Sequence, residues 1–139
     1  MSIKSTLVSG QKCRSFVQEL KPFHNSGSNR RHPKGSTLWG VQYGELYVVY
    51  SYGQHWPLYI NWEGIWFSNN DKSPSPTTTR HRTHANPYVP TLPVPGYNMK
   101  HIIELGYPVR ELLFRAADLK LVPEHLIAGV TALRVGVVA

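Results

Sequence analysis

The sequence contains one cysteine, no long apolar run and few charged residues. Cys13 stands alone among 139 residues, so no internal disulfide can form, which is compatible with a reducing compartment. No apolar run approaches the ~20 residues of a membrane-spanning helix, and the first residues lack the apolar stretch of a secretory signal. Hydrophobic residues still make up 41% of the chain, which argues against general disorder. We therefore expect a folded cytoplasmic protein without a membrane partner.

Acidic residues are scarce along the first two-thirds of the chain. Residues 1–34 hold seven lysines and arginines and one acid, Glu19, and residues 72–101 hold four basic residues and no acid. The whole chain carries a formal net charge of +7. An excess of this kind favours a polyanion such as nucleic acid as partner. Solubility is the other explanation of the same charge, and the sequence leaves both open.

The motifs of several large enzyme classes are missing. The chain has no P-loop, no dinucleotide fingerprint, no HExxH and no paired cysteines. His81 and His84 would share a face if they lie on a helix, and His55 would be a third ligand. Zinc sites, however, usually need three or four ligands with supporting partners. We therefore expect no metal and no cofactor.

The most readable part of the sequence, residues 36–69, predicts a β-meander. Its apolar runs are short, rich in β-branched and aromatic residues, and separated by turns such as Gly44-Glu45 and Glu63-Gly64. The strands expected are Leu38–Tyr43, Leu46–Tyr52, Pro57–Trp62 and Ile65–Ser68. Alternation along the second strand puts apolar or aromatic residues on both faces. The sheet is therefore either covered on both sides or exposes an aromatic platform.

The segments before this meander carry weaker signals. Residues 1–12 show no period and predict a flexible or loosely docked tail. Cys13–Phe23 fits either a strand or a short helix, and Pro22 ends it in both cases. The polar stretch His24–Gly35 is long for a connection, so it is either functional or an insertion.

After the meander the sequence changes to helical patterns. Residues 70–97 predict a Pro-rich connector that contains one short helix, Thr77–His84, and no central strand. Residues 98–139 predict helices, with Gly129 marking a close contact with a neighbour. The helices expected there are Met99–Leu105, Val109–Lys120 and Glu124–Arg134. The predicted fold class is α+β: a single domain with a small antiparallel β-meander of about four strands, packed with C-terminal helices.

Two segments contain side chains that suit a binding surface. The first, Ser51–Pro57, would project His55 and Trp56 from a loop, and the second, Asp71–His84, combines arginines, histidines and hydroxyls. Aromatic rings can stack on bases while lysine and arginine contact phosphates. The candidate binding residues are Arg30, Arg31, Lys34, Trp56, Tyr59, Lys72, Arg80 and Arg82. For the aromatic residues, packing in the core is the competing explanation.

The same region also holds the parts of a metal-independent ribonuclease. Phosphodiester cleavage can use one histidine as base, another as acid, and a cation to hold the charge that develops on the phosphate. His55, His81, Lys72 and Arg80 would fill these roles. Histidines that only pack in loops are the competing explanation, so a histidine-dependent ribonuclease is the alternative to binding.

The central half of the chain carries a longer pattern. Its parts are Thr37-Leu-Trp-Gly40, Tyr47 to Gly53, His55-Trp-Pro-Leu58, Trp66-Phe67, Asp71-Lys72-Ser73, Thr77-Thr78 and His81. In these residues the chain resembles an uncharacterised family of small proteins encoded by tailed phages and plasmids. The resemblance implies an origin in a mobile element and supplies no activity. The insertion Asn29–Lys34 departs from the family pattern, and the C-terminal helices lie outside it.

These observations favour a small basic accessory protein of a phage or other mobile element that acts by binding in the cytoplasm of its bacterial host. Its partner would be nucleic acid, or a host or defence complex that handles nucleic acid and that it inhibits. Exposed tryptophan, tyrosine and arginine are also typical anchors of protein interfaces. Mimicry of DNA needs acidic residues, so a basic inhibitor would instead contact the bound nucleic acid or an acidic patch.

Overall fold

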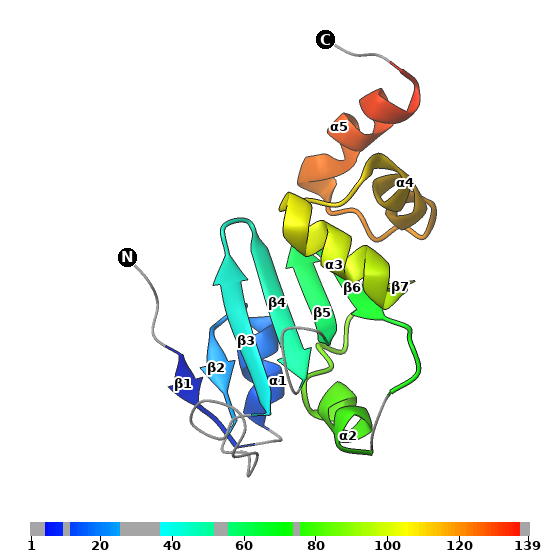
Figure 1. The fold of residues 1–139 in the computed structure, drawn as a ribbon. Coiled ribbons are helices and arrows are strands. Elements are labelled where there is room, and N and C mark those ends of the chain that lie inside the picture. The colour runs from blue at the N-terminus through cyan, green and yellow to red at the C-terminus, as the bar shows by residue number, and fades with distance from the viewer. Residues whose placement is uncertain (1–4, 10–11, 26–36, 52–55, 74–75, 137–139) are drawn as a thin grey trace.

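The computed structural model describes residues 5–9, 12–25, 37–51, 56–73 and 76–136, and its class is α+β, as the sequence predicts (Figure 1). The strands are β1 (Thr6–Leu7), β2 (Phe23–His24), β3 (Leu38–Tyr43), β4 (Leu46–Ser51), β5 (Pro57–Trp62), β6 (Ile65–Asn69) and β7 (Leu92–Val94). The helices are α1 (Cys13–Gln18), α2 (Pro76–His84), α3 (Gly96–Leu105), α4 (Arg110–Asp118) and α5 (Glu124–Arg134). All these strands join one sheet, in which their spatial order follows the chain.

Strands β3 to β6 confirm the predicted meander. Each pairs antiparallel with the next one along the chain. The β5–β6 turn consists of Glu63 and Gly64, both at positive φ (54° and 96°). Two turn residues at positive φ match the twist of the flanking strands, and glycine adopts this conformation at little cost. Local turn chemistry therefore accounts for this hairpin.

The sheet is larger than the predicted meander of about four strands. On one side β2 pairs antiparallel with β3, and β1 joins β2 in parallel; on the other side β7 joins β6 in parallel. The expected loose tail thus contains β1, which is followed by the buried Val8. The expected connector contains β7, where Pro93 is tolerated because an edge strand has one side without ladder hydrogen bonds. Strands of two or three residues are too short to show a period.

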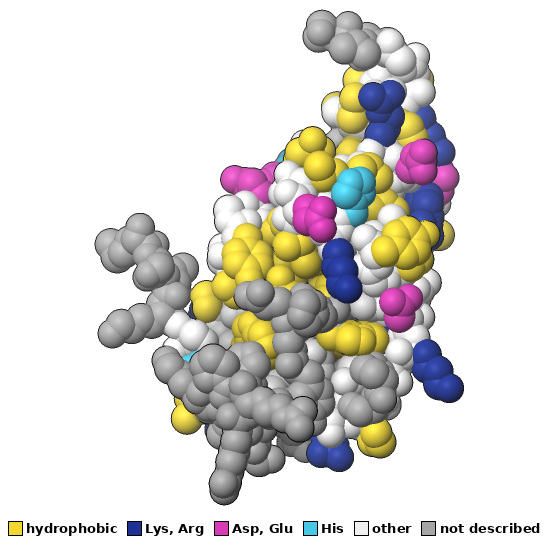
Figure 2. Space-filling view, in the orientation of Figure 1, with side chains coloured by type: hydrophobic (Ala, Val, Ile, Leu, Met, Phe, Trp, Pro, Cys, Tyr) yellow, Lys and Arg dark blue, Asp and Glu magenta, His cyan; other side chains and the backbone are white. Residues whose placement is uncertain are grey.

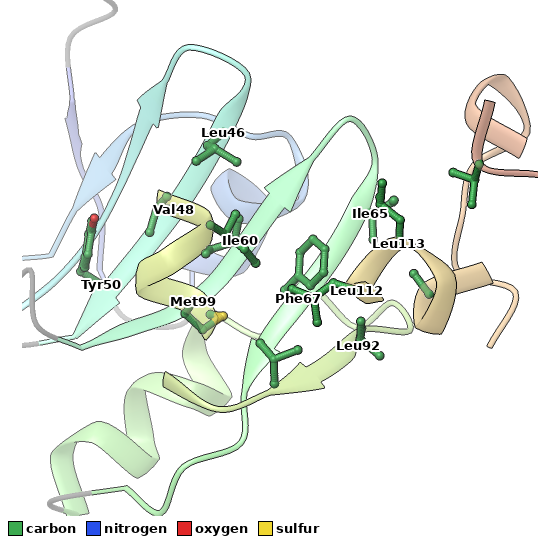
Figure 3. Packing of buried hydrophobic residues seen from close by; sticks show 14 residues of the cluster. Leu46, Val48, Tyr50, Ile60, Ile65, Phe67, Leu92, Met99, Leu112 and Leu113 are labelled. Atoms are coloured by element: carbon green, nitrogen blue, oxygen red, sulfur yellow. The ribbon is translucent and has the colours of Figure 1, made fainter. Parts of the chain in front are cut away.

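One face of the sheet packs against α3. Val48, Ile60 and Phe67 share a core cluster with Met99 of this helix, and Figure 3 shows them close together. The register aligns Val48 with Ile60 and Ile60 with Phe67, so the three strands contribute to one apolar row. Helix α4 adds Leu112 to the same cluster.

The opposite face packs against α1. Tyr47 and Val49 of β4 belong to a second cluster with Cys13 and Val17 of the helix. All residues of β4 are buried, so this strand is covered on both sides, which is the first of the two predicted alternatives. Its continuous apolar run is typical of a central strand rather than of a half-exposed one.

The C-terminal part is helical, and α5 has the predicted bounds. Helix α3 begins earlier than predicted, at Gly96 after Pro95. The close contact predicted at Gly129 is wrong, because a Cβ at this position would have nothing within 4 Å outside its own helix. Figure 1 shows the reason: α5 lies beyond α4, at the end of the molecule away from the sheet.

Candidate functional site at helix α2

Helix α2 is joined to the sheet by a buried polar network around His81. The His81 side chain is 4% exposed, and its Nδ1 lies 2.7 Å from Ser51 Oγ at the end of β4. Its Nε2 lies 3.4 Å from Thr37 Oγ1, directly before β3. Ser51 Oγ also donates to Thr78 Oγ1 on α2. Hydroxyl groups from the end of β4 and from the residue before β3 therefore hold the helix in place and satisfy a buried polar ring.

Asn25 extends this network to the end of β2. Its Nδ2 donates to Thr37 Oγ1 over 3.1 Å, and its Oδ1 accepts from the backbone N–H groups of Thr37 and Leu38. The residues on either side of segment 26–36 are thus bonded to each other and adjoin His81 through Thr37. The predicted binding residues of that segment, Arg30, Arg31 and Lys34, lie outside the described residues, and so does His55.

The surroundings of His81 keep its ring neutral at neutral pH. Burial, followed by the nearby charges of His84 and Arg80, lowers the pKa of His81 from 6.5 to about 4. Both ring nitrogens face hydroxyl groups of the protein. A ring held in this way contributes to the fold, and both of its nitrogens have partners within the protein. The predicted catalytic role of His81 therefore has no support from its position.

The guanidinium of Arg82 makes hydrogen bonds within the protein. Its Nε donates to Ser73 Oγ over 2.6 Å, and its two terminal nitrogens donate to the backbone carbonyls of Asn69 and Asp71. The guanidinium carbon also lies 5.1 Å from the centroid of the Trp56 ring. Arg82 thus ties α2 to the chain after β6, and it does so with the donors that a phosphate contact would use.

The two predicted aromatic contacts also belong to the fold. Tyr59 is buried, and its hydroxyl donates to the Arg82 carbonyl over 2.9 Å. Trp56 is partly buried, packs against the cluster beside α1 and carries Arg82 over its ring. Core packing, the competing explanation, therefore accounts for the position of Tyr59 and for the buried part of the Trp56 side chain.

We expect Arg82→Ala to lower the free energy of unfolding by roughly 2 kcal/mol, because two backbone carbonyls and a hydroxyl lose a charged partner. Arg80→Ala is the matched control on the same helix. The Arg80 side chain is exposed and makes no hydrogen bond or ion pair with other described residues, so its loss should change stability by less than about 0.5 kcal/mol. Urea denaturation of both variants measures the difference. Equal stabilities would contradict the structural role of Arg82.

Lys72 and Arg80 remain as predicted contacts at the surface. Both are exposed, and neither is part of an ion pair within the described residues. The ion pairs found there are Lys21–Glu19, His125–Glu63 and Arg134–Asp118. The carboxylate of Asp71, next to Lys72 in the chain, accepts instead from the Gly96 N–H over 3.0 Å. The positive charge at α2 therefore stays without an acidic partner in the described part of the chain.

Helix α1 holds the segment that follows α2. Arg14 donates to the carbonyls of Thr83 and Asn86 over 2.7 and 2.8 Å, and its guanidinium carbon lies 3.6 Å from the centroid of the Tyr88 ring. The sequence predicted neither these contacts of Arg14 nor the pairing of His81 with Ser51. Their members lie far apart in the chain, so no spacing pattern could signal them.

The site thus consists of a buried polar network with two exposed cations beside it. Among the described residues no three histidine, cysteine, aspartate or glutamate side chains are grouped as metal ligands, and no helix is long and apolar enough to span a membrane. No family model, curated protein or solved structure matches this chain. The resemblance to phage and plasmid proteins therefore stays a prediction, and function is argued from the geometry.

Proposed function

We propose that this protein is a binding protein of a mobile element, acting on nucleic acid or on a host or defence complex that handles nucleic acid. The observation that carries the proposal is the positive charge of Lys72 and Arg80, both exposed and without an acidic partner among the described residues. Lysines and arginines placed in this way contact phosphates in proteins that bind nucleic acid. The net charge of +7 adds long-range attraction for the same partner.

The anchoring of segment 26–36 supports one binding surface rather than two. Asn25 and Thr37 flank this segment and are hydrogen-bonded to each other. Thr37 in turn adjoins His81, the residue directly after Arg80. The residues that flank segment 26–36 therefore lie next to α2. A polyanion bound at α2 would lie near Asn25 and Thr37, the described residues that flank the segment with Arg30, Arg31 and Lys34.

The position of His81 favours binding over catalysis. Acid–base cleavage of a phosphodiester needs groups within hydrogen-bonding reach of the substrate. His81 is buried and bonded within the protein, which argues against a role as the second histidine of the ribonuclease alternative. Lys72 and Arg80 need no such partner to hold a phosphate.

Contacts with phosphates make affinity fall steeply as salt rises. We expect fluorescence anisotropy with labelled single-stranded RNA, single-stranded DNA and duplex DNA to show at least one probe with this behaviour. The variant Lys72→Gln/Arg80→Gln should bind more weakly. It should also lower the slope of log affinity against log salt by about two, because two phosphate contacts are lost.

The control variant Lys100→Gln/Arg110→Gln removes the same charge from exposed positions on α3 and α4. We expect it to keep the wild-type slope. An unchanged slope in the α2 variant, or equal losses in both variants, would speak against a surface at α2. If no probe binds, or if salt leaves the affinity unchanged, nucleic acid is not the direct partner.

A further inference from the structure

Helix α5 leaves most of its apolar surface uncovered. Ile127 is 49% exposed and Leu133 is 39% exposed, and Val130 is the one residue of the helix that is buried. Figure 2 shows hydrophobic side chains at the surface over this end of the molecule. A helix with apolar residues on several sides is ordinarily covered on more than one of them. The contacts with α4 therefore leave part of α5 without a partner.

A groove of about 410 Å³ lies beside this helix. It is lined by Ala117, Lys120, Val122, Ile127, Val130 and Thr131. Its walls come from α4, from the connection between the helices and from α5, and most of them are apolar. The groove therefore suits an apolar side chain presented by another helix.

The side of α5 that borders the groove has opposite charges at its two ends, so it complements the same side of a second copy in antiparallel orientation. Glu124, Ile127, Thr131 and Arg134 follow one another at intervals of three, four and three residues, which places them on one side of the helix. This side has an acid at its start, Ile127 and Thr131 in its middle and a base at its end. In an antiparallel pair of such helices each Glu124 meets an Arg134, and each Ile127 meets a Thr131. A parallel pair would bring like charges together at both ends.

We propose that the protein forms an antiparallel two-fold dimer through α5, in which a second copy of the chain occupies the groove. Asp118 fixes Arg134 at the helix end, with nitrogen–oxygen distances of 2.6 and 3.0 Å. Arg134 is thus already paired with a carboxylate of its own chain, and Glu124 of the second copy would be its second acidic partner. Because the interface is two-fold, each contact occurs twice, and Ile127 of each copy enters the groove of the other. The dimer does not depend on the function proposed for α2.

Sedimentation equilibrium of the full chain tests this proposal. We expect a monomer–dimer equilibrium for the wild type. Ile127→Glu would place a charge in the apolar groove and should weaken association by about tenfold or more. Tyr97→Glu introduces the same charge at a 73% exposed residue of α3 and should leave the dimerisation constant unchanged. A wild type that stays monomeric at all concentrations, or an Ile127→Glu variant that associates like the wild type, would overturn the proposal.

A charge reversal tests the antiparallel arrangement. Glu124→Arg would set a cation against Arg134 of the second copy and should weaken association about tenfold at low salt, with a smaller loss at high salt. Glu111→Arg makes the same reversal at an exposed position of α4 and is the control. Both substitutions lie at the surface, so circular dichroism should show a folded chain in each case. Equal association of the two variants would overturn the antiparallel pairing.

Discussion

Lowering the pH from neutral to about 4 is expected to remove roughly 3 kcal/mol from the free energy of unfolding through His81 alone. The pKa of His81 is about 4 in the folded chain, whereas its ordinary value is 6.5. Between these values the unfolded chain binds a proton that the folded chain does not, and each pH unit costs about 1.4 kcal/mol. The contribution is fully present above pH 6.5, declines as the pH falls from 6.5 to 4 and is absent below that window.

Urea denaturation at a series of pH values measures this effect in the wild type and in His81→Gln. Glutamine keeps hydrogen-bonding groups near Ser51 and Thr37 but does not titrate, so its stability should fall less across this window. His101→Gln removes an exposed histidine of α3 that does not act on His81 and should keep the wild-type dependence. If the stability difference between wild type and His81→Gln were independent of pH, the buried neutral state of His81 would be refuted.

Gly40→Ala is expected to lower the free energy of unfolding by about 3 kcal/mol, because β3 has no room for a methyl group at this position. A Cβ on Gly40 would lie 2.3 Å from Tyr47 Oη and 2.7 Å from Phe23 Cε1. Both rings are fully buried, and the Tyr47 hydroxyl is held by donation to the Lys21 carbonyl over 2.8 Å. The rings can therefore move aside only by breaking this hydrogen bond or the packing between β2 and β4.

Gly129→Ala is the matched control for this substitution. Nothing outside its own helix lies within 4 Å of the added methyl group, and alanine favours the helix by up to about 1 kcal/mol over glycine. The variant should therefore be as stable as the wild type or more stable. Chemical denaturation of both variants gives the comparison. A Gly40→Ala variant within about 0.5 kcal/mol of the wild type would contradict the described packing.

The sequence predicts the elements whose local signals agree with their surroundings. The hairpin at Glu63-Gly64 combines β-branched and aromatic flanks with a turn residue suited to positive φ, and α5 follows Pro123 with a regular apolar pattern. Strands β1 and β7 are different, because their pairing depends on β2 and β6 rather than on their own residues. A strand of two residues has no pattern of its own, so only the assembled sheet defines it.

In the candidate site, too, some features could be predicted from the local sequence and others depend on the assembled fold. Lys72 and Arg80 could be predicted as surface cations, because charge without nearby acids is visible in the sequence itself. His81 and Arg82 have side chains of the types that act on phosphates, but here they bind the protein. Their partners lie on β4 and at the end of β6, and no local sequence pattern predicts these contacts. Residue type indicates what a side chain can do, and the fold decides which partner it meets.

The proposed binding function is tested most directly by incubating the protein with labelled single-stranded RNA, single-stranded DNA and duplex DNA, with and without EDTA. Native and denaturing gels are then run side by side. The proposal predicts a probe that is shifted in the native gel, intact in the denaturing gel and released as salt rises. Cleavage that persists in EDTA and is lost in His55→Ala would contradict it and establish the ribonuclease instead. Probes that remain both unshifted and intact would contradict direct binding of nucleic acid and leave a protein complex as the partner.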